Sequence, residues 1–252
     1  MEELRKHVLT ERGLHTAHRM IKVWRALWQA MATMKYCDKH ADPSKIIRNT
    51  APSGRSETWK PGELARIAKQ AWRSGYSGLA TIISIAWDTQ FSPGDCRLLK
   101  LSQLVKDPDG WYFSTARVKT DEAIIGTLSR RSERLLIIYL QSLPVAISDN
   151  MKIFRNRSGQ FYSADTLGDD FREVRTITFP YDNRKLLDIR RTGAVEALAG
   201  GADPGAMAAK MGNSIDHNKA LQKTYLPNQV ETVRLADEAR KRGRNVLRKN
   251  KQ

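Results

Sequence analysis

The stretch from Gly78 to Thr89 limits the possible folds of this chain most strongly, because its sequence, GLATIISIAWDT, is almost wholly apolar. A helix that is apolar on all sides is stable only in the interior of a protein. We therefore predict a buried helix over residues 78–89. Apolar residues make up 40% of the whole chain, which is ordinary for a folded protein and sufficient for a real core.

Helical patterns surround this stretch. Lys60-Pro61-Gly62-Glu63 predicts the start of a helix that runs through Trp72, because proline is tolerated in a first helical turn. Further helices are predicted over about 93–101, over 131–143, over 164–174 with Ser163 as its cap, over 188–198 and over 204–211. Residues 111–120 (WYFSTARVKT) are rich in β-branched and aromatic residues and predict a strand, and the DEAIIGTLS segment that follows is expected to pair with it.

The N-terminal region predicts a long helix over residues 14–36. Its apolar residues recur at three- and four-residue steps, at Ala17, Met20, Trp24, Leu27, Met31 and Met34, and its basic residues Arg19, Lys22 and Arg25 are expected on other faces. The segment over 41–56 is rich in proline, serine, glycine and basic residues, which predicts a linker. A unit of this size is too small for a robust core of its own. We expect it to pack against the rest of the chain, against DNA or against a neighbouring protomer.

The charge of the chain indicates a polyanionic partner. Lysine and arginine number 43 against 27 aspartates and glutamates, a formal net charge of +16. Such an excess attracts nucleic acid, whereas acidic residues usually serve solubility better. Residues 240–252 alone carry seven basic residues and no acidic one, and are expected to be disordered or ordered by DNA.

Other classes of protein are disfavoured by what the sequence lacks. Cys37 and Cys96 are far apart, which indicates neither a disulfide scaffold nor a zinc site and favours a reducing compartment. The first residues contain no apolar signal segment, and no stretch approaches the length of a membrane helix. The five histidines lack the spacing of metal ligands. We expect a cytoplasmic, nucleoid-associated protein with no membrane partner, no cofactor and no metal.

Three segments, taken in order, resemble the tyrosine recombinase (phage integrase) family. Residues 89–104 (TQFSPGDCRLLKLSQL) are similar to its T-G-x-R-x-x-E-L-x-x-L-x-W-x-D-I segment, with Thr89, Asp95, Leu99 and Leu104 in register with the family's T, E, L and I. Lys119 follows a predicted strand, where the family carries a hairpin lysine, and residues 186–215 with Tyr225 are similar to its H-x-x-R, L-G-H and tyrosine segments. Each motif alone is weak, but three in order with plausible spacing are specific. The resemblance covers roughly residues 14–228.

The resemblance implies a fold and a partner. The fold is mainly α with a small antiparallel β-hairpin or sheet, a tyrosine-recombinase catalytic domain preceded by a truncated helical core-binding unit. We expect a partial core-binding domain and linker over 1–56, a catalytic-type domain over 57–228, and a C-terminal helix with a basic tail over 229–252. Together they would clamp double-stranded DNA mainly through its phosphates, and a homo-oligomer on DNA is compatible with the resemblance.

The family's chemistry assigns roles to three residues that this chain retains. A tyrosine hydroxyl attacks a backbone phosphodiester, two arginines stabilise the charge that gathers on the phosphate oxygens, and a lysine protonates the leaving hydroxyl. The resemblance implies Tyr225 as the nucleophile, Arg190 as one of the two arginines and Lys119 as the acid. Without that context, Tyr225 could be a core aromatic, Lys119 a solvated lysine and Arg190 a salt-bridged helix residue beside Asp188.

Three positions of the implied catalytic site are degenerate. Ser92 stands where the family has its first arginine, Leu187 where it has the histidine of H-x-x-R, and Asn213 where it has the histidine of L-G-H. Losing one preorganised donor costs about a hundred- to a thousandfold in rate. Arg97 is expected to point away, and Arg184 and Lys185 are the better candidates to compensate.

These residues leave three functional hypotheses open. The leading hypothesis is a duplex-DNA-binding protein of this family without efficient strand cleavage, acting as a regulator, an accessory or a relic. The second is an active integrase with a divergent site, and the third is a basic RNA-binding protein, against which the ordered motifs argue. The DNA-binding residues predicted are Lys119, Arg190, Arg191, Arg240, Lys241, Arg242 and Arg244, with Arg191 expected to face the DNA backbone or solvent.

Overall fold

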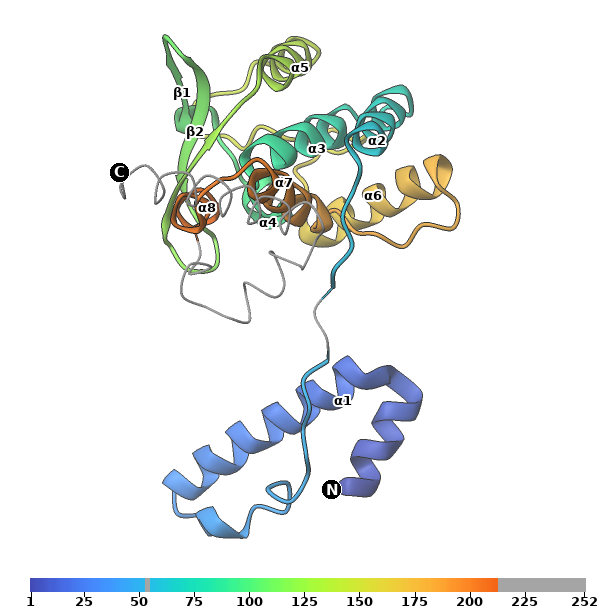
Figure 1. The fold of residues 1–252 in the computed structure, drawn as a ribbon, viewed down its shortest axis with the longest axis vertical. Coiled ribbons are helices and arrows are strands. Elements are labelled where there is room, and N and C mark those ends of the chain that lie inside the picture. The colour runs from blue at the N-terminus through green and yellow to red at the C-terminus, as the bar shows by residue number, and fades with distance from the viewer. Residues whose placement is uncertain (53–54, 213–252) are drawn as a thin grey trace, which may run out of the picture. The chain divides into compact units, whose positions relative to one another are not determined.

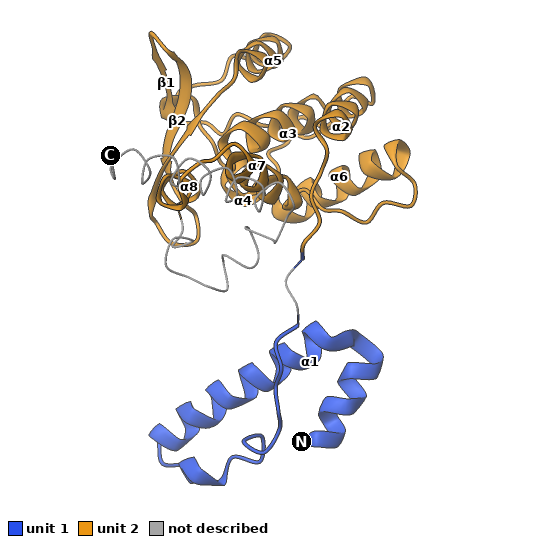
Figure 2. Cartoon of the chain, viewed as in Figure 1, with its two compact units in different colours: residues 1–55 blue, residues 56–252 orange. Residues whose placement is uncertain are grey.

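The chain divides into two compact units. This computed structural model describes residues 1–52 and 55–212 of the 252-residue chain. The units are Met1–Arg55 and Ser56–Gln252 (Figure 2). Each has its own buried side chains, a few in the first unit and a large continuous cluster in the second.

The first unit is built on one long, broken helix, α1 (Glu2–Thr33). The helix changes direction at Gly13, whose φ of 80° and ψ of 170° are not helical (Figure 1). Glycine adopts this conformation readily because it has no Cβ. The long helix predicted over 14–36 is confirmed for most of its length, and a further helical segment precedes Gly13.

The face of α1 that is buried differs from the predicted one. Ala17 and Ile21 are fully buried, whereas Leu27 and Met34 are 54% and 61% exposed. Arg25 was expected on a face other than the apolar one, and its Nη2 donates to the carbonyls of Ser44 and Ile47 at 2.8 and 2.9 Å. The guanidinium group satisfies the backbone of a turn that packs on the helix.

The segment predicted to be a linker therefore begins later than expected. The short 3-10 helix η1 (Lys39–Ala41) reaches into its first residue, and Asp42 accepts a hydrogen bond from Nε1 of Trp24 at 3.1 Å. Ser44 and Ile47 are buried. Residues 42–47 thus belong to the packed unit, because their buried polar groups find partners on α1.

The second unit is organised around α3 (Ser77–Thr89), which lies among the other helices (Figure 1). It is buried along almost its whole length, as its apolar sequence predicts. It contacts α2 (Pro61–Arg73), α5 (Arg130–Gln141), α6 (Ala164–Thr178) and α7 (Asp188–Ala199).

The predicted starts of the surrounding helices are confirmed. Pro61 occupies the first turn of α2, and the Glu63 carboxylate accepts from the backbone N–H of Lys60 at 2.8 Å. Ser163 caps α6 by accepting from the backbone N–H of Thr166 at 3.0 Å. Helix α6 runs on to Thr178, beyond the predicted end.

A three-stranded antiparallel sheet packs beside the helices. Its strands are β1 (Leu104–Asp107), β2 (Gly110–Ala116) and β3 (Ala123–Thr127), in the order β1-β2-β3. The predicted hairpin is confirmed as β2 and β3, with Phe113 opposite Gly126. Strand β1, opposite β2, was not predicted.

The helix predicted over about 93–101 is much shorter in the structure. Helix α4 covers only Pro93–Cys96, and the 3-10 helix η2 (Leu101–Gln103) precedes β1. Leu99 accepts from the backbone N–H of Ile153, and Lys100 forms an isolated antiparallel bridge with Lys152. This strand-like pairing with a distant segment ends the helix early.

Helix α8 (Pro204–Met211), predicted over the same residues, lies beside the β2–β3 hairpin (Figure 1). It ends at Gly212, which has a φ of 54°. A Cβ at this position would lie 2.3 Å from Cγ2 of Ile124 on β3, so only glycine allows this approach. None of the helices in residues 1–52 and 55–212 is long and apolar enough to cross a membrane.

Candidate functional site

The described parts of the three segments singled out by the sequence come together in the second unit. Arg190 of α7 donates through Nη1 to the carbonyl of Gln90, at the end of α3, at 2.9 Å. Its Nη2 donates to the carbonyl of Met211, at the end of α8. Arg117, in the loop between β2 and β3, donates to the carbonyl of Gly212 at 2.6 Å. The residues around these contacts form the candidate site.

Ser92 acts in this site as a helix cap. Its Oγ accepts from the backbone N–H of Asp95 at 3.2 Å, and its own N–H donates to Oδ2 of Asp95 at 3.3 Å, a reciprocal capping box at the start of α4. The Ser92 hydroxyl also donates to Oδ2 of Asp95 at 2.6 Å. The other carboxylate oxygen of Asp95 accepts from the backbone N–H of Val118 at 3.0 Å. Asp95 is only 5% exposed, so it fastens the hairpin loop to α4 from a buried position.

Arg190 is almost fully enclosed, with 2% of its surface exposed. One of its acceptors, the carbonyl of Gln90, belongs to a residue in the left-handed conformation, with a φ of 59°. Gly193 leaves room for this turn, because a Cβ there would lie 2.7 Å from Cγ of Gln90. Contact between Arg190 and a DNA phosphate stays a prediction, and it requires neighbouring groups to move.

Arg191 does not face solvent as expected. It is 6% exposed, and its Nη1 donates to Oδ1 of Asp188 at 3.2 Å and to the carbonyl of Glu57 at 3.1 Å. The whole start of α7, from Asp188 to Ala194, is buried, and Arg191 is buried with it. Arg191 thus ties the start of the second unit to α7.

Lys119 and Leu187 both lie at the surface. Lys119 is exposed in the loop between β2 and β3, where the backbone N–H of Asp121 donates to the carbonyl of Arg117 at 2.8 Å. Leu187 is 49% exposed immediately before α7. An apolar side chain therefore stands at the surface where the family resemblance implies a histidine.

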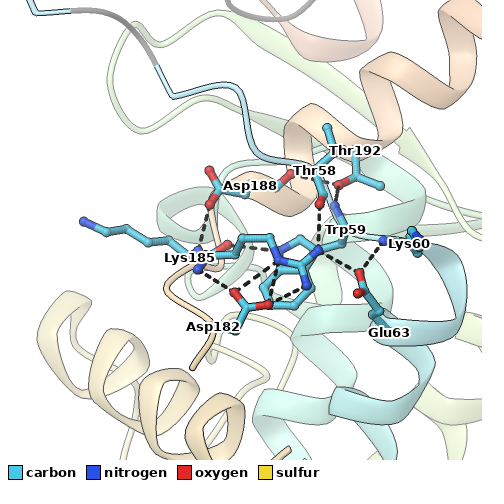
Figure 3. Close-up of polar contacts among 9 residues, drawn as sticks. Thr58, Trp59, Lys60, Glu63, Asp182, Lys185, Asp188 and Thr192 are labelled. Carbon is cyan, nitrogen blue, oxygen red and sulfur yellow. Dashed lines mark hydrogen bonds and ion pairs between the residues drawn. The ribbon is translucent and has the colours of Figure 1, made fainter. Parts of the chain in front are cut away.

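Arg184 cannot take the place of an arginine at position 92, because its donors are engaged by Thr58, Glu63 and Asp182, which Figure 3 labels. Its guanidinium donates to Glu63 at 2.7 Å, to the carbonyl of Thr58 at 2.8 Å and to both carboxylate oxygens of Asp182. It also stacks on the ring of Trp59, 3.8 Å from the centroid. Hydrogen bonds from Arg184 hold the pKa of Glu63 below its usual value.

The side chains of Lys185 and Arg97 are also directed elsewhere. Lys185 is exposed, and its side chain extends away from Asp182 and Glu63 (Figure 3). Arg97 donates to the carbonyl of Tyr162 at 3.4 Å, outside the three segments.

Arg117 is a site residue that the sequence analysis missed. Its Nε lies 3.9 Å from Oδ2 of Asp95, and its side chain is 16% exposed. A signal was present, since Arg117 stands two positions before Lys119 in the same loop.

Six of the predicted site residues lie outside the described part of the chain, namely Asn213, Tyr225, Arg240, Lys241, Arg242 and Arg244. Within residues 1–52 and 55–212, no three histidine, cysteine, aspartate or glutamate side chains gather in a way that could hold a metal ion. The buried thiol of Cys96 adjoins Asp95 and Arg190, and burial raises its pKa.

The sequence matches no protein-family model and no curated protein. Solved structures are nevertheless similar over most of the chain. A lambda integrase dimer bound to a COC′ core site superimposes with a TM-score of 0.70 at 14% identity, covering 90% of this chain and 64% of that one. The chain thus spans less than two thirds of that integrase.

Two further solved structures have a similar fold. XerH site-specific recombinase bound to difH substrate, in a pre-cleavage complex, gives a TM-score of 0.67 at 14% identity, over 94% of this chain and 68% of that one. The Tn1549 transposon integrase in complex with a circular intermediate DNA gives a TM-score of 0.64 at 14% identity, over 92% of this chain and 82% of that one. Similarity at these identities establishes the fold. The expected mainly helical, tyrosine-recombinase type of fold with a small antiparallel sheet is confirmed.

Proposed function

We propose that this chain is a duplex-DNA-binding protein of the tyrosine recombinase family that lacks efficient strand cleavage and acts as a regulator, an accessory or a relic. One observation carries the proposal. The three motif segments meet at one site, yet the side chain at position 92 caps a helix there instead of presenting a positive charge. The site has kept its architecture and lost part of its chemistry.

Binding to duplex DNA is supported by charge and by fold. The net charge of +16 favours a polyanion, and the similar lambda integrase and XerH structures contain DNA. The RNA-binding alternative finds no support in these neighbours.

Weak cleavage is supported by the side chains at the degenerate positions. Ser92 contributes a neutral hydroxyl that is committed to Asp95, and Leu187 has no donor to offer. Each preorganised donor that is missing from a transition state costs about 2.7–4 kcal/mol. The two losses together would slow cleavage by several orders of magnitude.

The second candidate, an active integrase, is favoured by the position of Lys119. The lysine is exposed in the hairpin loop, so its ammonium group is open to solvent and not committed to the core. Arg190 is also retained in its motif, and Tyr225 would be the nucleophile.

A covalent-trapping assay separates the two candidates. A nicked duplex that releases a short strand on cleavage traps the protein on DNA, and Tyr225→Phe is the control. We expect no adduct above that control, and some adduct from the triple variant Ser92→Arg, Leu187→His, Asn213→His, because groups that act on one transition state work as a unit. Abundant Tyr225-dependent adduct from the unaltered protein would establish the integrase instead.

A further inference from the structure

The guanidinium groups of Arg117 and Arg190 meet at the same end of α8. Arg190 donates to the carbonyl of Met211, and Arg117 donates to the carbonyl of the next residue, Gly212. Consecutive Cα atoms of a chain are about 3.8 Å apart, so groups that bind consecutive carbonyls are neighbours. One arginine comes from a helix and the other from a hairpin loop, and the tertiary fold alone brings them together.

Arg117 is held in this place from two sides. Oδ2 of Asp95 lies 3.9 Å from its Nε, and the same carboxylate anchors the loop through the N–H of Val118. On the other side, a Cβ at position 212 would lie 2.8 Å from Cδ of Arg117. The glycine therefore lets the arginine stem pass close to the end of α8.

The two arginines differ in their exposure. Arg190 is 2% exposed, whereas the side chain of Arg117 is 16% exposed and Lys119 of the same loop is exposed. Arg117 is thus the member of the pair that keeps contact with solvent. Of the two guanidinium groups, that of Arg117 is therefore the more accessible to a ligand.

Asp95 links Arg117 to the degenerate position. The oxygen that accepts from the hydroxyl of Ser92 at 2.6 Å, Oδ2, is also the oxygen closest to Arg117. The Arg117 guanidinium therefore lies close to the place that the side chain of Ser92 occupies. The junction brings together two guanidinium groups and one carboxylate, which suits an anion.

We infer that Arg117, together with Arg190, binds one backbone phosphate of duplex DNA and supplies the guanidinium that position 92 lacks. Planar guanidinium groups form parallel, charge-assisted hydrogen bonds to the two non-bridging oxygens of a phosphodiester. The inference rests on the proposed function. In this arrangement Arg117 contributes to phosphate binding but does not restore cleavage, because Leu187 still offers no hydrogen-bond donor.

The test compares Arg117→Gln with a matched control, Arg172→Gln. Glutamine keeps a donor for the Gly212 carbonyl but removes the charge, and Arg172 is an exposed arginine that pairs with Asp169 on α6. Affinity for a fluorescent duplex of about 30 base pairs is measured from about 50 to 200 mM salt. We expect Arg117→Gln to weaken binding and to reduce the slope of log affinity against log salt by about one, with no such change in the control. Equal slopes in the two variants would overturn the inference.

A rescue experiment separates phosphate binding from a structural role. In the double variant Ser92→Arg, Arg117→Gln, the new guanidinium takes the place from which Arg117 was removed. We expect affinity and salt slope to return toward those of the unaltered protein. A structural role of Arg117 at the end of α8 would not be restored from position 92, so a failed rescue in a folded double variant counts against the inference.

A measurement on the unaltered protein covers the case in which Arg117→Gln does not fold. The Nε–Hε signal of Arg117 is assigned in an NMR spectrum by its loss in Arg117→Lys, and the same short duplex is then added. We expect this signal to shift, and an unmoved signal at saturating DNA would refute the inference. Absence of any salt-dependent binding by the unaltered protein would instead refute the proposed function.

Discussion

Replacing Asp95 by alanine should release the hairpin loop from α4, because one buried carboxylate holds both. It accepts from the hydroxyl and the N–H of Ser92 at 2.6 and 3.3 Å, and from the N–H of Val118 at 3.0 Å, and it lies 3.9 Å from Nε of Arg117. At 5% exposure, water replaces few of these bonds in the folded variant.

The cost follows from the contacts that are lost. A hydrogen bond to a charged group contributes about 1.5–3 kcal/mol, and a buried donor left without a partner costs about 1–3 kcal/mol. The Arg117 contact is long and partly exposed, so it adds little. We expect Asp95→Ala to reduce the free energy of unfolding by about 3 kcal/mol, which lowers the melting temperature by about 6–12 °C in a unit of this size.

Two further variants serve as controls for this prediction. Asp95→Asn keeps one carbonyl oxygen for the N–H of Val118 and an amide that can donate to Ser92, so it should cost only about 1 kcal/mol. Asp169→Ala removes an exposed carboxylate that is paired with Arg172, and it should cost less than about 0.5 kcal/mol. Melting is followed by near-ultraviolet circular dichroism at pH 7. If Asp95→Ala and Asp169→Ala have the same melting temperature, the buried carboxylate does not hold the loop against α4.

Three other outcomes follow from the structure and the sequence. Gly212→Ala should lower stability by about 2 kcal/mol or more in urea unfolding, because an alanine Cβ would collide with Ile124 at a φ of 54°; wild-type stability would contradict the close approach. Deletion of 240–252 should weaken duplex binding and flatten its salt slope while leaving the melting temperature unchanged, and a large drop would mean that the segment packs. Hydrogen bonds from Arg184 lower the pKa of Glu63, so the stability it contributes is present at neutral pH and is lost as pH falls below 4.5, its ordinary value. Glu63→Gln should therefore show a shallower loss of melting temperature between neutral pH and the acid range, and an unchanged profile would contradict this.

Local signals in the sequence predicted most of the helices. Such signals determine the structure of residues close to them in the sequence. Examples are the apolar run of α3, the proline at the start of α2 and the serine cap of α6. Their effect survives in the fold because the tertiary environment agrees with it. The end of α4 was mispredicted for the opposite reason, since Leu99 and Lys100 pair with the distant segment at 152–153.

The directions of basic side chains were predictable only in part. Arg25, Arg184 and Arg191 all lie in stretches that favour exposure by composition, yet each satisfies backbone carbonyls of residues far away in the sequence. A guanidinium carries five donors and a long apolar stem, so it can be enclosed wherever a fold leaves unpaired carbonyls. Which carbonyls those are depends on packing and cannot be read from spacing along the chain.

Serine stands at position 92, where the family resemblance implies an arginine, so the positive group nearest to the buried carboxylate of Asp95 comes from Arg117. Asp95 falls in register with the acidic residue of the family segment, and a buried carboxylate is costly without a positive partner or several donors. Here the hydroxyl of Ser92, the N–H of Val118 and the guanidinium of Arg117 surround it. The contacts of Asp95 with Val118 and Arg117 keep the hairpin loop against α4 while serine occupies position 92. A site can therefore retain the charge that binds a phosphate after it has lost the donors that cleave one, since binding needs only positive charge within reach while cleavage needs several groups aimed at one transition state.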